Sequence, residues 1–358
     1  MMHHMPLPYV LKPEELPKVL PSIHLRYSQD SASGFTREKN GKSFIYLDSN
    51  RRRITDKRIL ERLEALAIPP AWKNVWISPL ENGHLQATGT DEKNRKQYIY
   101  HPTWISLTQQ NKFNKTILFA TLLPELRKIV DKDLSLPNLS ERKVLATIVW
   151  LLGNTYIRIG NDEYTKENNH YGLTTFQTQH VSVKNEEVTF HYVGKSGKEH
   201  TVNVSNPRVA RTIRKLEELP GLELFQYIDN QGQQISIDSG EVNEYLHEIT
   251  QRDITAKDFR TWGGTLLASE TLYQLGIPGD QKNMKKNISS AIKYVAKHLH
   301  NTPHVSRMYY IHPLVFDTYK KDILVPYFQE RYQNTKSGNY MSKSEKVTSS
   351  LLKEYSHA

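Results

Sequence analysis

The chain has 358 residues, a balance of 48 Lys+Arg against 38 Asp+Glu, a net charge of +10, and no cysteine. This length exceeds what one hydrophobic core usually organises, so two domains are expected, and the positive charge favours a polyanionic partner. The absence of cysteine excludes a thiol nucleophile, a disulfide framework and a cysteine-ligated zinc.

The first third of the chain has the pattern of strands and turns. Asn40-Gly41 lies between two strand-like runs and predicts a hairpin, because this pair tolerates the positive φ values of a tight turn. Residues 55–67 predict an amphipathic helix that ends before Pro69-Pro70. Strand character then resumes until helical periodicity begins near residue 106. We therefore predict a β-rich N-terminal domain over residues 1–106.

The next part of the chain, residues 107–333, has the pattern of a mainly helical domain. Ser140 is a candidate N-cap for a helix that continues through Leu152. Residues 176–204 alternate with period two around two turn-like sequences, which predicts a three-stranded ribbon. Five further helices are predicted, over residues 208–218, 239–251, 256–275, 289–300 and 313–329.

The last segment, residues 334–358, is rich in serine and lysine. This composition predicts a polar, flexible tail, within which VTSSLLKEY has the pattern of a short helix. The expected fold class is therefore α+β: a small β-rich N-terminal domain, a larger and mainly α-helical domain with a three-stranded β ribbon, and a tail.

The N-terminal sequence lacks the apolar core of a secretory signal, and no run of about 18 apolar residues occurs. We therefore expect a cytoplasmic protein without a membrane partner. No metal site is expected either, since HEITQ at His247 departs from the HExxH motif at Gln251.

Four separated sequences bring together the residue types that metal-free transesterification at a phosphodiester requires. They contain Arg158 in TYIRIGNDEY, Lys195 in YVGKSGKEH, Arg260 in AKDFRTWGGT and Tyr310 in NTPHVSRMYYIHP. A tyrosine oxygen attacks phosphorus, arginines hold the non-bridging oxygens, and a lysine protonates the leaving oxygen. Taken one at a time, these residues also fit a helix C-terminus, a solvated turn, an ion-paired helix face and a buried aromatic pair.

The order of these residues, the short sequence motifs around them and their spacing resemble those of the type IB DNA topoisomerases, in particular their poxvirus-like bacterial branch. The resemblance extends from about residue 26 to about residue 319. It implies a clamp-shaped enzyme that cleaves one strand of duplex DNA to a 3′-phosphotyrosyl intermediate, allows rotation and religates. It also implies that neither ATP nor a divalent ion is required, that no obligate protein partner exists, and that the enzyme acts as a monomer on nucleoid DNA.

The resemblance also implies a role for each candidate catalytic residue. Tyr310 is the nucleophile rather than its neighbour Tyr309, and Lys195 is the general acid rather than Lys198. The remaining catalytic candidates are phosphate ligands or assist proton transfer: Arg158, Arg260, Asn301 and Lys257. Asn301 departs from the viral members, which have histidine there, and an asparagine donates a hydrogen bond without a positive charge.

A second set of residues is predicted to bind DNA. The sequence ATGTDEKNRKQYIYHPTW resembles an N-domain stretch of the family, and strand alternation puts Gln97 and Ile99 on one face and Tyr98 and Tyr100 on the other. The run Arg51–Arg53 is most simply a solvated cluster. The predicted DNA contacts are Tyr164, Lys93, Arg95, Gln97, Tyr98 and Tyr100.

Two alternatives remain at this point. Tyrosine site-specific recombinases share the Arg-Lys-Arg-Tyr chemistry, but they usually have histidine where this chain has Lys257, and they have a helical core-binding domain. A non-catalytic duplex DNA-binding protein of the same fold is disfavoured because all the expected catalytic side chains are present.

Overall fold

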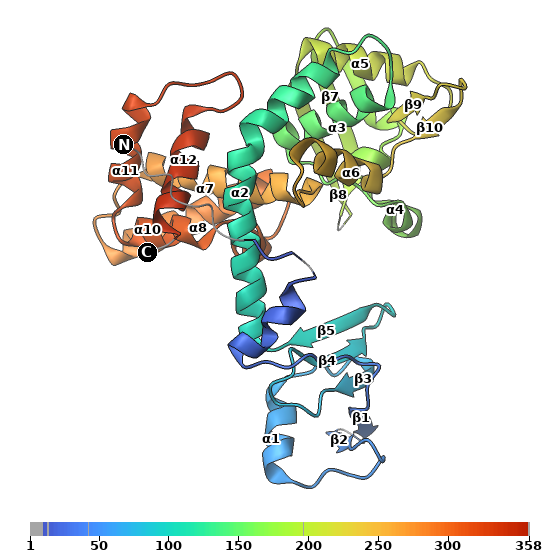
Figure 1. Ribbon diagram of the computed structural model, residues 1–358, viewed down its shortest axis with the longest axis vertical. Coiled ribbons are helices and arrows are strands. Elements are labelled where there is room, and N and C mark those ends of the chain that lie inside the picture. The colour runs from blue at the N-terminus through green and yellow to red at the C-terminus, as the bar shows by residue number, and fades with distance from the viewer. Residues whose placement is uncertain (1–9, 13, 42, 196, 357–358) are drawn as a thin grey trace. The chain divides into compact units, whose positions relative to one another are not determined.

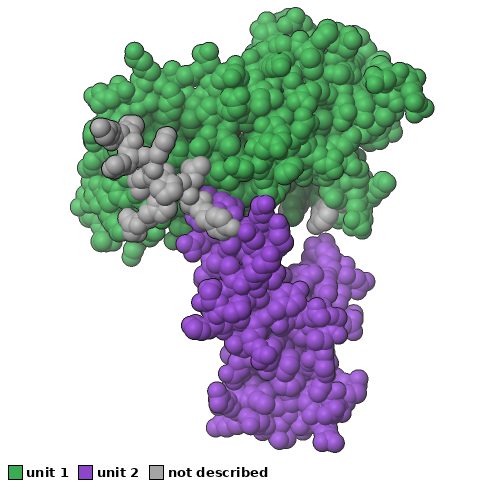
Figure 2. Space-filling model, viewed as in Figure 1, with its two compact units in different colours: residues 1–8, 115–358 green, residues 9–114 purple. Residues whose placement is uncertain are grey.

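The structure is a computed structural model that describes residues 10–12, 14–41, 43–195 and 197–356, with the backbone alone for Tyr164. It contains two compact units, one of residues 9–114 and a larger one of residues 115–358 (Figure 2). The chain passes from one unit to the other within a single helix, α2 (Pro102–Leu134). We predicted the boundary after residue 106, at the start of this helix.

The smaller unit is an antiparallel five-stranded sheet of order β2-β1-β3-β4-β5, together with one helix (Figure 1). The strands are β1 (Phe35–Asn40), β2 (Ser43–Leu47), β3 (Lys73–Ile77), β4 (Leu85–Thr90) and β5 (Lys96–Tyr100). The short 3-10 helix η1 (Leu16–Ile23) precedes them. The predicted β-rich character of this region is confirmed.

The hairpin and the helix predicted for this unit are both present. Asn40 pairs with Ser43, so Asn40 is the last strand residue and Gly41, with φ +61°, begins the turn. The helix α1 (Lys57–Ala65) begins after Asp56, whose carboxylate accepts a hydrogen bond from the Ile59 amide at 3.1 Å. Its apolar face packs on the sheet and buries Leu63 completely.

The larger unit is mainly helical and has one sheet of order β6-β7-β8 and one two-stranded sheet. Its long helices are α3 (Glu141–Thr155), α5 (Pro207–Glu217), α6 (Ser239–Thr250), α7 (Ala256–Leu275) and α8 (Gln281–His298). The predicted ribbon is confirmed as β6 (Val181–Lys184), β7 (Glu187–Gly194) and β8 (Lys198–Ser205). The predicted cap is confirmed too, since Ser140 Oγ accepts from the Lys143 amide at 3.4 Å.

The helix α7 is the centre of this unit. It contacts α3, α6, α8, α10, α11 and α12, and most of its side chains are buried (Figure 1). A helix surrounded in this way is apolar on nearly every side, with no single hydrophobic stripe. Any charged side chain on α7 that faces inward must therefore find partners within the unit.

Some local predictions for this unit were wrong. The helix predicted over residues 313–329 is two helices, α10 (Pro313–Lys320) and α11 (Leu324–Asn334), because Asp322 has φ +55° and breaks the helical path. The elements α4 (Asp162–Asn168), α9 (Pro303–Tyr309), β9 (Gln226–Ile228) and β10 (Gln234–Ser236) had no prediction.

The short helix predicted in VTSSLLKEY is confirmed and begins four residues earlier, as α12 (Lys343–Tyr355), so these residues are not the flexible tail that the composition predicted. Its leucines Leu351 and Leu352 are fully buried. Glu345 receives two hydrogen bonds from the Arg127 guanidinium, at 2.8 and 2.9 Å. Burial by itself raises the pKa of Glu345, but the Arg127 fork outweighs burial and holds that pKa below its ordinary value. Core packing and a paired carboxylate together hold α12 in the larger unit.

Candidate active site

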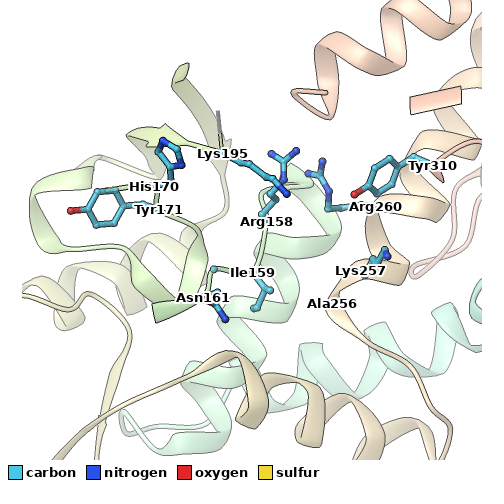
Figure 3. Close-up of a pocket in the computed structure, with 11 residues that line it drawn as sticks. Arg158, Ile159, Asn161, His170, Tyr171, Lys195, Ala256, Lys257, Arg260 and Tyr310 are labelled. Atoms are coloured by element: carbon cyan, nitrogen blue, oxygen red, sulfur yellow. The ribbon is translucent and has the colours of Figure 1, made fainter. Parts of the chain in front are cut away.

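A cavity of about 330 Å³ in the larger unit brings together five of the predicted catalytic residues (Figure 3). These are Arg158, Lys195, Lys257, Arg260 and Tyr310. Its other lining residues are Ile159, Gly160, Asn161, His170, Tyr171 and Ala256. The five come from four separate parts of the chain, so only the folded unit assembles them.

Arg158 is positioned by the end of α3. Tyr156 ends this helix with a left-handed conformation, φ +56°, which turns the chain toward the cavity. The Arg158 guanidinium then donates through Nη2 to Asn301 Oδ1 at 2.6 Å and to the His300 carbonyl at 3.4 Å. Asn301 therefore joins the site through Arg158, although it does not line the cavity.

Arg260 is only 4% exposed, on the buried side of α7. Its Nη2 donates to the Leu299 carbonyl at 2.6 Å and its Nη1 donates to the Tyr156 carbonyl. Burial, followed by the charge of Arg158, lowers the pKa of Arg260 to about 10, while Tyr310 opposes this shift through its charge and a hydrogen bond. Arg260 therefore remains a cation at neutral pH.

Tyr310 follows the short helix α9, and its ring faces Arg260. The Arg260 Cζ atom lies 5.2 Å from the Tyr310 ring centroid, and Figure 3 shows the tyrosine hydroxyl directed toward the guanidinium. Tyr309 is 49% exposed and is not among the residues that line the cavity. The structure thus distinguishes these adjacent tyrosines by the direction of their side chains.

Two glycines of α7 allow the close packing behind the tyrosine. A Cβ atom on Gly264 would lie 2.5 Å from the Tyr310 carbonyl oxygen, and one on Gly263 would lie 2.3 Å from the Tyr156 ring. Thr265 Oγ1 also donates to the Tyr310 carbonyl, at 3.4 Å. This part of α7 therefore packs against the backbone of Tyr310 and against the ring of Tyr156, the residue whose carbonyl accepts a hydrogen bond from Arg260.

The two lysines approach the cavity from different elements. Lys195 lies in the turn that joins β7 to β8, next to the closing pair Gly194 and Lys198, and Figure 3 shows its side chain extending toward the guanidinium groups. Lys257 lies in the first turn of α7 and also lines the cavity. Lys198 does not line it.

The sequence interpretation missed His170. This side chain lines the cavity, and its Nδ1 atom is buried without a hydrogen-bond partner among the described residues. His170 belongs to NDEYTKENNHYGLTT, the same sequence motif that contains Tyr164. The motif was recognised in the sequence, but no role was predicted for its histidine. The side chain of Tyr164 lies outside the described residues.

The candidate DNA-binding residues of the N-terminal region lie in the smaller unit, on β5 and the turn before it. Tyr98 and Tyr100 share a face, with ring centroids 5.9 Å apart and planes 9° apart. Arg95 Nε and Gln97 Nε2 donate to Asp91 at 2.8 and 3.0 Å. Their hydrogen bonds show that two of the predicted DNA contacts already have a protein partner.

The Asp91 carboxylate has a pKa well below its ordinary value. The Arg95 side-chain hydrogen bond is the main cause that lowers the pKa of Asp91 to about 2. Lys93, whose amide donates to Asp91 Oδ1 at 2.9 Å, has an exposed side chain. The turn before β5 is therefore ordered by Asp91 and presents Lys93 to solvent.

Two other features, a membrane-spanning helix and a metal-binding cluster, are absent from the described residues. No helix in these ranges is long and apolar enough to cross a membrane. Within the same ranges, no group of three or more histidine, cysteine, aspartate or glutamate side chains has an arrangement that could hold a metal ion.

Comparisons with known proteins identify the family of this chain. The family model for the catalytic core of eukaryotic DNA topoisomerase I matches residues 101–336, and the model for the N-terminal domain of bacterial DNA topoisomerase IB matches residues 43–91. The chain is 33% identical to DNA topoisomerase 1B of Acanthamoeba polyphaga mimivirus over 81% of this chain and 88% of the viral protein. It is 22% identical to DNA topoisomerase 1B of Vaccinia virus (strain Copenhagen) over 74% and 83% of the two chains. The protein therefore belongs to the type IB DNA topoisomerase family.

Proposed function

We propose that this topoisomerase relaxes supercoiled duplex DNA with Tyr310 as its nucleophile and a set of four cationic side chains around the reacting phosphate. The observation that supports this best is the shared cavity, in which Tyr310 faces Arg260 while Arg158, Lys195 and Lys257 line the other walls. A phenol oxygen surrounded by cations suits attack on a phosphodiester, whose transition state concentrates negative charge.

Cleavage transfers the DNA 3′-phosphoryl group from the 5′ oxygen of the next nucleotide to Tyr310. The phenol oxygen forms a bond to phosphorus and releases its proton to solvent water, and the bond from phosphorus to the 5′ oxygen breaks. Lys195 donates a proton to that leaving oxygen. Lys257, which lies in the first turn of α7, assists this proton transfer. The phosphodiester energy is kept in the phosphotyrosyl bond, so the reverse reaction reseals the strand without ATP.

Arg158 and Arg260 stabilise the non-bridging oxygens during both steps. Arg260 Nε and Asn301 Nδ2 are buried donors without hydrogen-bond partners in the part of the chain that the structure describes. Buried donors normally have acceptors, and the oxygens of a bound phosphate would supply them. Asn301 contributes a neutral hydrogen bond, whereas the two arginines also contribute charge.

The smaller unit is proposed to be a DNA-binding domain. Lys93, Tyr98 and Tyr100 have side chains suited to contact phosphates or groove edges, and Tyr98 is 47% exposed. Arg95 and Gln97 are held by Asp91, so they are proposed to contact DNA through their remaining donors. Tyr164, which lies close in the sequence to the cavity residue Arg158, is proposed to contact the DNA backbone beside the cleaved phosphate.

We further propose that the enzyme acts as a monomer on nucleoid DNA in the cytoplasm. One chain supplies every proposed catalytic residue, so the reaction requires no residue from a second subunit. A tyrosine recombinase, in contrast, assembles around paired sites.

The decisive experiment is relaxation of a negatively supercoiled plasmid that carries no paired recombination sites. The purified protein is expected to relax it fully in the presence of a chelator and without ATP, because the proposed chemistry uses side chains only. Gel electrophoresis measures the topoisomers, and sedimentation measures the oligomeric state of the same preparation. Activity that disappears with the chelator, or that appears only with paired sites, would contradict the proposal.

DNA binding is expected to weaken steeply with salt. Each neutralised phosphate contributes a slope of about −0.9 to log K against log salt concentration, so contact with about six to ten phosphates lowers affinity about 10³–10⁵-fold between 50 and 200 mM. Fluorescence anisotropy with the Tyr310→Phe variant measures binding apart from cleavage. Lys93→Ala is expected to reduce the slope by about 1. A flat salt dependence would mean that few phosphates are contacted.

A further inference from the structure

Two histidine rings lie against each other next to the candidate active site. His200 is on β8 and His300 follows α8, and their ring centroids are 4.0 Å apart with planes 44° apart. His200 is only 6% exposed, and its Nε2 has no hydrogen-bond partner within the described ranges. A buried imidazole that makes no hydrogen bond through this atom contributes mainly through its ring contacts.

On one side, this contact belongs to the hairpin that presents Lys195. A Cβ atom on Gly194, the residue before Lys195, would lie 2.6 Å from His200 Cδ2. Tyr192 of β7 also packs against the ring, with centroids 5.3 Å apart. The His200 ring therefore lies directly beneath the turn, and a displacement of this ring displaces the turn.

On the other side, the contact belongs to the segment that holds both arginines. The Leu299 carbonyl accepts a hydrogen bond from Arg260 at 2.6 Å. The His300 carbonyl and the side-chain oxygen of Asn301 both accept hydrogen bonds from Arg158, at 3.4 and 2.6 Å. His300 has φ +51°, a conformation that directs these successive groups to different partners. The two rings thus join the lysine turn to the arginine-holding segment.

Three cations and one further histidine face the two rings. The cations are Lys198 on β8, Arg158 after α3 and Arg260 on α7, and the histidine is His298 on α8. Burial, and then these cations, lower the pKa of His200. Burial, His200 and the arginines lower the pKa of His300 to about 4. Both rings are therefore neutral at pH 7, and two imidazolium rings at 4.0 Å would repel each other.

Building on the proposed role of Lys195, we propose that the His200–His300 stack is a positioning device that holds the general-acid turn in register with the two arginines. The stack acts on the geometry of proton donation and touches no reacting atom itself. This positioning depends on both rings being neutral, so protonation in acidic solution, well below the ordinary pKa of histidine, releases the turn while the arginines keep their charge.

The test compares cleavage of two DNA substrates under single-turnover conditions. One has the natural 5′-oxygen leaving group, and the other has sulfur at that position. A thiolate is a much weaker base than an alkoxide and leaves without a proton donor, so the second substrate reports on the arginines and Tyr310 but not on the general acid. Lys195→Ala provides the reference pattern: slow on oxygen, fast on sulfur.

His300→Ala is expected to cleave the oxygen substrate about 10–100-fold more slowly, the size of effect produced by a misplacement of about 1 Å. It is expected to cleave the sulfur substrate at nearly the wild-type rate, and His300→Phe, which keeps an aromatic ring, is expected to recover most of the loss. His247→Ala is the control, because His247 is exposed on α6 and its ring contacts the Arg252 carbonyl at 3.1 Å, away from the stack. Thermal unfolding checks that each variant is folded.

The pH dependence provides a second readout. Because its folded-state pKa is lowered, His300 remains neutral as pH falls below the ordinary histidine value and gains its proton near pH 4. Wild-type cleavage of the oxygen substrate is expected to fall over this range, and the fall is expected to be smaller in His300→Phe. Cleavage of the sulfur substrate is expected to lack this component.

Three results would overturn the proposal: no loss in His300→Ala, an equal loss on both substrates, or no recovery in His300→Phe. Failure of the proposed function gives a different pattern. If the wild-type protein forms no covalent adduct, the function itself is wrong. If Lys195→Ala is equally slow on both substrates, the general-acid role of Lys195 is wrong, and the positioning proposal fails with it.

Discussion

Phenylalanine in place of Tyr310 is expected to abolish both covalent adduct formation and plasmid relaxation. The substitution removes one oxygen and keeps the ring that lies 5.2 Å from the Arg260 Cζ atom, so the packing of the cavity is largely preserved. Phenylalanine has no oxygen with which to attack phosphorus. Denaturing electrophoresis of the protein after incubation with labelled DNA measures the adduct, and a topoisomer gel measures relaxation.

Tyr309→Phe is the matched control. Tyr309 is the preceding residue and is exposed, so its variant is expected to form the adduct and to relax DNA. DNA affinity and thermal stability are expected to be close to wild type in both variants. An inactive Tyr309→Phe beside an active Tyr310→Phe would move the nucleophile by one residue. Two active variants would remove tyrosine catalysis from this segment altogether.

The second large effect is expected from Arg158→Ala, which should slow strand cleavage by about 10²–10³-fold, by analogy with loss of one oxyanion donor. Arg158 is half-buried and its known partners are Asn301 and the His300 carbonyl, so its removal leaves the core packing intact. Quenched-flow cleavage of an oligonucleotide measures the rate. The loss is expected on the oxygen and sulfur substrates alike, since the arginine stabilises phosphate oxygens and does not protonate the leaving group.

Arg158→Lys and Arg211→Ala complete this experiment. Lysine keeps the charge but cannot donate from a planar fork, so only part of the lost rate is expected to return. Arg211 is exposed on α5 and does not line the cavity, and its loss removes the same charge without touching the site. A cleavage rate in Arg158→Ala within a few-fold of wild type would exclude Arg158 from transition-state stabilisation.

Local sequence patterns predicted much of the secondary structure because the interactions that form these elements are short-range. The Ser140 cap, the α1 face that buries Leu63 and the period-two ribbon all depend on residues a few positions apart. The same logic explains two errors. Nothing local marked the left-handed residue Asp322 that divides α10 from α11, and the polar composition of the tail concealed the leucines that α12 buries.

The candidate chemistry was also visible in the sequence, since the family resemblance depends on short words around Arg158, Lys195, Arg260 and Tyr310. These words named the residues but contained no information on how far apart the side chains lie. Their convergence on one cavity is a property of the tertiary structure, because α3, the β7–β8 turn, α7 and the residue after α9 come together only when α7 is buried.

The sequence by itself therefore determined the family, the α+β class and the identity of the candidate side chains. Only the tertiary structure decided which of two adjacent tyrosines faces Arg260, why α7 has glycine at 263 and 264, and how His200 comes to touch His300. The physical reason is separation along the chain. The two histidines are one hundred positions apart in the sequence, and the 4.0 Å separation of their ring centroids is specified by the packing of the whole unit and by no local pattern.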